Sequence, residues 1–251
     1  AVFASTQKTA LLVFQENSGN LGTTVFGPLL DNLSAATKKQ IEDGVDFFIE
    51  EFEKEFSGFA ASAGREYNRV DFLEDATAVP DQFKAKIKEL VNQDYTIDII
   101  TIGHGSNKRL VGFQGASITD QTLRDLRNEV GRALPIRMVY MMNCRGSTLN
   151  SAWINAGAQV SGGSLGDNWM PEPMLHNFWK NWVGGMNFAD AISDAYKSTR
   201  GIWSFIYKDL TLIPAGVNAT QALNDSEPVF QGNGSLDIVT NIKLVANEIL
   251  V

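Results

Sequence analysis

The residues best suited to chemistry are one cysteine and one histidine, each placed just after an apolar run. Cys144, the only cysteine in the chain, follows the run Met138–Met142, and His104 follows the run Thr96–Ile102. A thiol beside an imidazole forms a nucleophile–base pair, because the imidazole can accept the thiol proton. The residues after Cys144 resemble the start of a helix, where the helix dipole favours the thiolate form.

Both runs are predicted to be buried strands of one parallel sheet. His104 precedes Cys144 by 144 − 104 = 40 residues, enough for one helix and one strand between them. Neighbouring parallel strands lie about 5 Å apart, and their carboxyl ends meet at the edge where open α/β sheets bind ligands. We therefore expect His104 and Cys144 to converge. The N–H groups of Gly105 and Cys144 are predicted to form an oxyanion hole.

Four further residues are candidates for substrate binding at the same edge: Glu16, Asn143, Ser164 and Asp167. Glu16 ends the first apolar segment, and Asp167 closes a glycine-rich stretch. If both carboxylates face the cleft, they match a cationic substrate side chain by charge. The alternative interpretation is that they are two solvated loop acids.

The stretch Gly162–Gly166 formally matches the nucleophile elbow of serine hydrolases, with Ser164 as nucleophile. Its context differs from that motif, because Asp167 and His176 follow within a dozen residues. A flexible glycine loop at the rim of a cleft is the favoured interpretation, and a serine hydrolase is the less favoured one. The chain has no G-x-G-x-x-G after its first predicted strand, which argues against a nicotinamide cofactor.

Composition restricts the remaining classes. The chain has 251 residues and 44% hydrophobic content, enough for one substantial core. Its net charge of −8 argues against a nucleic-acid partner. One cysteine excludes an internal disulfide, and two histidines argue against a metal site, so we expect no metal and no cofactor. No apolar run is long enough to span a membrane. The first residue, Ala1, suggests processing and an extracytoplasmic location, and the sequence does not specify an oligomeric state.

Hydrophobic periodicity predicts an α/β three-layer sandwich with a mainly parallel sheet. Strands are expected at Thr9–Phe14, Arg65–Leu73, Ile97–Ile102, Met138–Met142 and Ala158–Ser161, and a β-hairpin at Arg109–Ile118. Helices are expected at Ser34–Phe56, from Pro80, from Asp120 after a Thr119 cap, and at Thr148–Ala156, Met174–Val183 and Phe188–Thr199.

The residues after about 200 change in character. Strands are expected at Trp203–Tyr207, Leu210–Ile213 and Leu236–Leu250. We therefore predict a main domain of residues 1–200 and a β-rich extension, 201–251, packed on the same domain. The alternative is that these strands are added to the edge of the main sheet.

Two sequence blocks resemble the caspase-fold cysteine peptidases of clan CD, the group of caspases, legumains, gingipains and clostripain. These blocks are IITIGHGS, Ile99–Ser106, and MVYMMNCRGS, Met138–Ser147, and the resemblance covers roughly Thr9–Thr199. It implies a caspase-like arrangement and hydrolysis of peptide or protein substrates through a thioester. Cys144 would be the nucleophile, His104 the general base or acid, and Gly105 and Cys144 the oxyanion donors.

This chain departs from the family at one position. Several relatives have an acid two residues before the cysteine, where it binds a basic side chain, but this chain has Met142. Asp167 or Glu16 would have to replace that acid. A non-catalytic interaction or signalling domain with the same fold is the alternative function.

Overall fold

The computed structural model describes residues 8–16, 63, 66–209 and 217–238. Within these residues the chain folds around a six-stranded sheet with the order β2-β1-β3-β7-β8-β9. The strands are β1 (Lys8–Gln15), β2 (Arg69–Glu74), β3 (Tyr95–Ile102), β7 (Ile136–Met142), β8 (Val160–Ser164) and β9 (Pro228–Gly232). All neighbours pair in parallel except β9, which is antiparallel to β8. The predicted α/β class with a mainly parallel sheet is confirmed.

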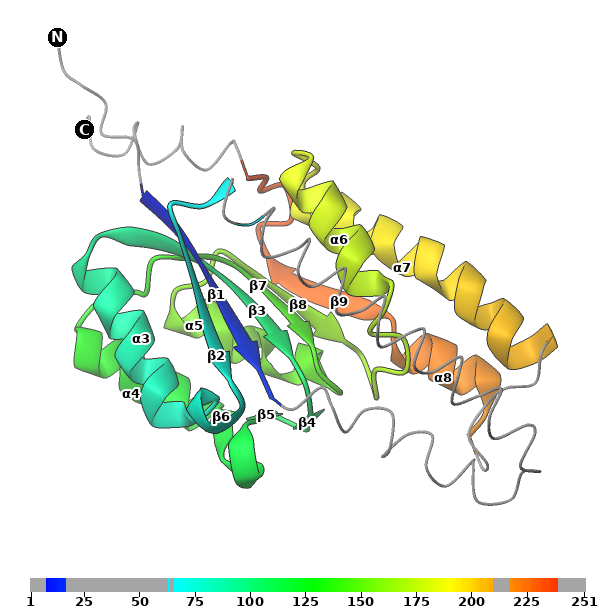
Figure 1. The fold of residues 1–251 in the computed structure, drawn as a ribbon, viewed down its shortest axis with the longest axis horizontal. Coiled ribbons are helices and arrows are strands. Elements are labelled where there is room, and N and C mark those ends of the chain that lie inside the picture. Colours follow the sequence, from blue (N-terminus) through cyan, green and yellow to red (C-terminus); the bar gives the residue numbers. More distant parts are fainter. Residues whose placement is uncertain (1–7, 17–62, 64–65, 210–216, 239–251) are drawn as a thin grey trace, which may run out of the picture.

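Helices cover both faces of this sheet (Figure 1). One face carries α3 (Pro80–Asn92), α4 (Asp120–Val130) and α5 (Asn150–Ala156), and the other carries α6 (Met174–Val183) and α7 (Phe188–Ser204). Side chains alternate between the two faces along β1. Leu12 and Phe14 pack in the core under α3, α4 and α5, and Leu11 and Val13 pack in the core under α6 and α7. Strands buried on both faces are continuously apolar, which is why they are visible in the sequence.

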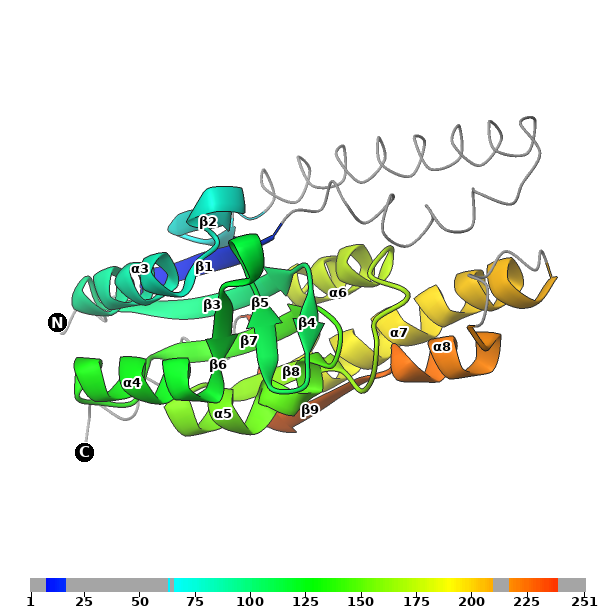
Figure 2. The same cartoon turned by 90° about the horizontal axis from the view of Figure 1, so that it is seen from below.

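A second, smaller sheet lies at the carboxyl ends of the main strands (Figures 1 and 2). It consists of β4 (Gly105–Ser106), β5 (Arg109–Val111) and β6 (Ser117–Thr119), and it confirms the predicted hairpin. Short 3-10 turns are η2 (Asp75–Thr77), η3 (Phe113–Gly115) and η4 (Gly146–Leu149). The Thr119 hydroxyl caps α4 by accepting from Thr122 N–H, as predicted from the sequence.

Two predicted segments differ from the structure. The glycines of the expected loop, Gly162 and Gly163, lie within β8, where Gly162 faces Phe188 and Ile192 of α7. The expected strand Trp203–Tyr207 is helical, because α7 continues to Ser204 and a π-helical turn, Phe205–Asp209, follows. The alternating aromatic residues suggested a strand, but helical spacing instead brings the Trp203 and Tyr207 rings together, with centroids 5.1 Å apart.

The C-terminal part contains α8 (Ala219–Asp225) and the strand β9. β9 pairs with β8 and forms an edge of the main sheet. The expected helix Ser34–Phe56, the strand Leu210–Ile213 and most of Leu236–Leu250 lie outside the described residues. The division at residue 200 stays a prediction, and α7 spans that position. In the part of the chain that the structure describes, no helix is long and apolar enough to cross a membrane.

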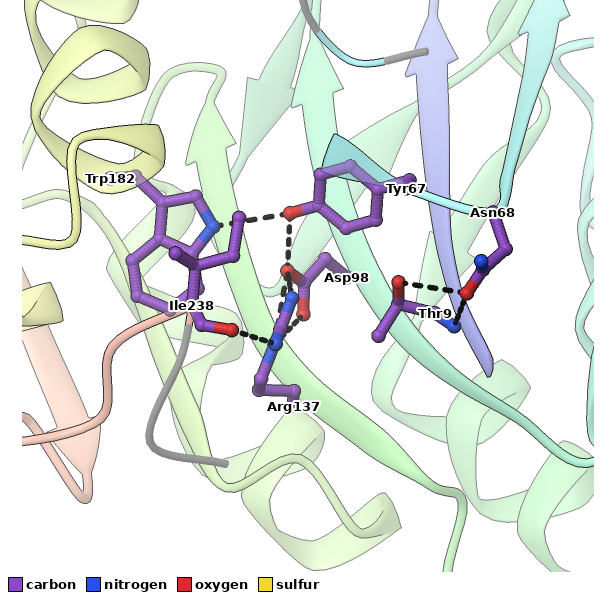
Figure 3. Close-up of polar contacts among 7 residues, drawn as sticks. All are labelled: Thr9, Tyr67, Asn68, Asp98, Arg137, Trp182 and Ile238. Carbon is purple, nitrogen blue, oxygen red and sulfur yellow. Dashed lines mark hydrogen bonds and ion pairs between the residues drawn. The ribbon is translucent and has the colours of Figure 1, made fainter. Parts of the chain in front are cut away.

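A buried ion pair joins β3 and β7 on the face of the sheet that α6 covers (Figure 3). Arg137 and Asp98 are at most 1% exposed and are joined by Arg137 Nη2 to Asp98 Oδ2 at 2.6 Å. Tyr67 donates its hydroxyl to the same carboxylate at 2.5 Å, and Trp182 Nε1 donates to Tyr67 at 3.1 Å. Burial and Asp98 raise the pKa of Tyr67, so the phenol keeps this proton. Arg137 also donates to the carbonyl of Ile238 at 3.0 Å, which holds the C-terminal segment on the core.

Candidate active site

The carboxyl ends of four adjacent strands bring the predicted site residues to one edge of the sheet. The final pairs of the ladders are Gln15 with Ile102, Ile102 with Met142, and Met141 with Gly163. Glu16, Gly103 and Asn143 directly follow these pairs, and His104 and Cys144 come next along the chain. The histidine and cysteine segments therefore lie at a common edge of the sheet, and the pairing of the two side chains stays a prediction.

Gly105 brings the histidine segment into contact with the cysteine segment. A side chain at this position would overlap with Asn143 Nδ2 and with the carbonyl oxygen of Cys144. The two loops therefore touch through a residue that has to be glycine. His104, next to it in the chain, is partly exposed.

The backbone direction at Gly105 follows from its ladder with β5. Val111 N–H donates to the carbonyl of His104 at 3.0 Å, and Gly105 is the antiparallel partner of Leu110. Bonded and non-bonded pairs alternate in such a ladder. Because His104 and Val111 are a bonded pair, Gly105 and Leu110 are not, and the Gly105 N–H points away from β5. It is thus not bonded within this ladder.

The Cys144 thiol is partly exposed and accepts a hydrogen bond from the backbone N–H of Asn168 at 3.4 Å. Burial raises the pKa of Cys144, and the Asn168 N–H, which favours the thiolate, does not outweigh it. The thiolate expected from a helix start is therefore not supported. A 3-10 turn, Gly146–Leu149, separates Cys144 from α5, which weakens the dipole argument.

Asn143 and Ser164 support the cysteine loop from inside the protein. Asn143 is fully buried, accepts from Thr101 Oγ1 at 2.9 Å and donates to the Cys144 carbonyl at 3.0 Å. Ser164 is 2% exposed, and its hydroxyl lies 2.9 Å from the carbonyl oxygens of Asn143 and Gly166. These side chains are hydrogen-bonded within the protein itself, and their expected role in substrate binding stays a prediction. Ser164 also lies in a strand and not on a nucleophile elbow, which argues against the serine-hydrolase alternative.

The two candidate acids have different surroundings. Asp167 is 44% exposed and pairs with Arg145 Nε at 2.9 Å, so its charge is already matched within the protein. Arg145 follows Cys144 in a left-handed conformation, φ 54°, and its N–H donates to the carbonyl of Gly166. Glu16 is half-buried beside Gly103, and no described residue gives a hydrogen bond to its Oε2. Glu16 is therefore the acid next to the histidine loop that has no charge partner among the described residues.

Asn168 is the site residue that sequence reasoning missed. Besides its N–H contact with sulfur, its Nδ2 donates to the carbonyl of Met142 at 3.2 Å, which fastens the loop after β8 to the end of β7. A backbone donor leaves no signature in residue type. The only sequence feature that pointed to Asn168 was its position, four residues after the end of β8.

Comparison with known proteins gives matches among solved structures. No family model matches the sequence, and no curated protein matches it. Among solved structures, the chain is similar to a secreted C11 cysteine protease from Bacteroides thetaiotaomicron, in complex with an irreversible peptide inhibitor. The two chains are 9% identical with a TM-score of 0.41, and the likeness covers 85% of this chain and 62% of the protease chain. This chain thus spans less than two thirds of the length of that protease.

Proposed function

We propose that the chain is a cysteine-type peptidase in which Cys144 is the nucleophile and His104 the proton acceptor. The observation that carries this proposal is the contact between the two strand-end loops, made through Gly105. That contact supports a site in which a thiol, an imidazole and a backbone N–H group lie at one edge of the sheet. These are the three groups that acyl transfer by a thiol requires.

The proposed reaction begins from a neutral thiol, since burial raises the pKa of Cys144. His104 accepts the thiol proton as sulfur attacks the scissile carbonyl carbon. The N–H groups of Gly105 and Cys144 stabilise the negative oxygen of the tetrahedral intermediate. The imidazolium then protonates the leaving amine as the C–N bond breaks, leaving a thioester on Cys144. Water hydrolyses this thioester, with His104 accepting one water proton, and the thiol is restored.

The proposed substrate is a peptide or protein, without a stated preference for basic residues. Met142, two residues before the cysteine, is 3% exposed and carries no charge. Asp167 would bind a cationic side chain only in exchange for Arg145. Glu16 is the remaining carboxylate for that purpose. An extracytoplasmic location, predicted from the sequence, belongs to the same proposal, and detection of the chain in the extracellular fraction of its native cells tests it.

A peptide-library cleavage screen tests the proposal. The wild-type chain is expected to cleave a subset of peptides, and iodoacetamide treatment or Cys144→Ala is expected to abolish that cleavage. Cleavage that survives both changes would refute the assignment of Cys144. A fluorophosphonate probe on the same samples reports any serine nucleophile.

A non-catalytic interaction domain is the second candidate, and the raised thiol pKa favours it. The two candidates differ in what His104→Ala does to the reaction of Cys144 with a peptide carrying an electrophilic carbonyl. A peptidase loses most of its labelling rate, because the base is removed. An interaction domain labels equally slowly with and without His104.

A further inference from the structure

A polar cavity of about 530 Å³ lies between α4, α5 and the turn that joins β4 to β5. Figure 2 shows this arrangement, with α4 and α5 side by side and the small sheet next to them. The volume falls in the range of small-molecule sites. Only two of the lining residues are apolar, Ala152 and Ala156, so the cavity favours a polar ligand.

The charged residues of this cavity are mainly cationic. Lys108, Arg124 and Arg127 line it together with one carboxylate, Asp120, which gives 3 − 1 = +2. The whole chain carries −8. An anion is attracted by this local positive charge and repelled by the acidic remainder of the protein. The charge distribution therefore favours anion binding at the cavity.

The two arginines differ in their partners. Arg124 pairs with Asp120 one turn earlier on α4, and these side chains are 52% and 38% exposed. Such an exposed pair stabilises little, so a doubly charged anion can replace Asp120 with stronger bidentate bonds. Arg127 donates to the carbonyl of Asn155 on α5, which holds its guanidinium at the cavity wall.

Lys108 provides the third cation from the β4–β5 turn. It lies in the β4–β5 turn with φ 55° and has no ion-pair partner within the described part of the chain. Nearby acids are engaged elsewhere: Glu129 binds Lys84 and Lys88, and Asp125 accepts from Gln121. The positive charge that faces the cavity is therefore not neutralised by these neighbours.

We propose that this cavity binds a small ligand bearing at least two anionic groups, an oligophosphate or a polycarboxylate. One group binds the arginines on α4, and a second reaches Lys108. The hydroxyl and amide side chains of the lining (Thr148, Ser151, Asn128 and Asn155) supply neutral hydrogen bonds. This proposal does not depend on peptidase activity.

The same cavity wall is bonded to the cysteine loop. Lys108 N–H donates to Thr148 Oγ1 at 2.7 Å, and that hydroxyl donates to the carbonyl of Arg145, also at 2.7 Å. Arg145 is the residue after Cys144, and the hairpin of Lys108 carries Gly105. A ligand that draws Lys108 and α4 together is therefore expected to change the alkylation rate of Cys144.

Calorimetric titration of the purified chain with inorganic tripolyphosphate tests the proposal, and tricarballylate in a second arm distinguishes phosphate from carboxylate recognition. At low ionic strength, we expect one saturable site with a Kd below about 1 mM for at least one of them. Lys108→Gln with Arg124→Gln should weaken binding by roughly tenfold or more. If that double variant unfolds, Ser151→Glu, an exposed substitution in the lining, should weaken binding by repulsion.

The matched control is Lys180→Gln with Lys197→Gln, which removes the same charge from exposed positions of α6 and α7, on the other face of the sheet. We expect it to bind the ligand as the wild type does. The proposal would be overturned if neither ligand showed saturable binding up to about 10 mM. It would also be overturned by an equal loss of affinity in the control, because that result would mean that net charge alone attracts the ligand.

Discussion

At the scale of single residues, the state of the Cys144 proton decides how the site can work. The sulfur accepts a hydrogen bond from the Asn168 N–H, and burial raises the pKa of the thiol. A stable thiolate–imidazolium pair at rest is not favoured by these surroundings. In the proposed reaction the proton therefore leaves during attack, with His104 as the proposed acceptor.

The pH dependence of alkylation tests this state. Because the pKa of the folded thiol is raised, the thiolate fraction is still increasing at alkaline pH. The iodoacetamide rate at Cys144 is expected to rise by about tenfold per pH unit between about pH 6 and pH 9. Mass spectrometry of the modified chain measures it. A rate that levels off near neutral pH would mean that the thiolate exists at rest.

The support under the cysteine loop gives a second prediction at this scale. Thr101→Val removes the hydroxyl that Asn143 Oδ1 accepts from, and it leaves a buried amide oxygen without that donor. We expect the free energy of unfolding to fall by about 1–3 kcal/mol. Thr96→Val is the control, since Thr96 is buried on the same strand without a hydrogen bond from its hydroxyl to a described residue. Urea unfolding of both variants should separate them, and equal losses would contradict the assigned support role.

At the scale of elements, apolar runs and helix signals were sufficient to predict most of the fold. β1, β3 and β7 are recognisable because both faces are buried, and α4 because Thr119 caps it. Gly162 and Gly163 were assigned to a loop because glycine usually marks turns. They lie in β8, where the backbone of Gly146 approaches Gly163 and the side chains of α7 approach Gly162, a requirement that no local pattern reveals.

A pair of glycine substitutions tests that explanation. In Gly163→Ala, the new Cβ would lie 2.9 Å from the carbonyl carbon of Gly146, and backbone cannot move aside cheaply. We expect a loss of roughly 1–3 kcal/mol in the free energy of unfolding. Gly201, inside α7, has open space around it, so Gly201→Ala should stabilise by about 0.5–1 kcal/mol. Stability changes of the same sign in thermal unfolding would show that the close contact is not the cause.

At the scale of the whole molecule, stability depends on contacts between residues that are far apart in the chain. Asp98 and Arg137 are 39 positions apart, and Ile238 is 101 from Arg137. Sequence patterns identify the strands that carry these residues but not which buried charges meet. The same limit applies to the site, where His104 and Cys144 were predictable as strand-end residues and the Asn168 contact was not.

Breaking the buried ion pair gives the prediction at this scale. Arg137→Met leaves Asp98 buried without its cation, which is expected to cost about 3–5 kcal/mol. Asp98→Asn combined with Arg137→Met should cost less than the two single changes added together, because the unpaired charge is gone. Arg124→Met, at an exposed ion pair, is the control and should change stability by no more than about 0.5 kcal/mol. Additive losses in urea unfolding would contradict a direct pair.

The central claim is that His104 accepts the Cys144 proton, and the initial rate of peptide hydrolysis by two histidine variants tests it most directly. His176 is exposed on α6 and provides a control of the same residue type. Using any peptide that the wild type cleaves, we predict that His104→Ala lowers the rate by about 10²- to 10⁴-fold and that His176→Ala leaves it unchanged. Equal rates for the two variants would contradict the account.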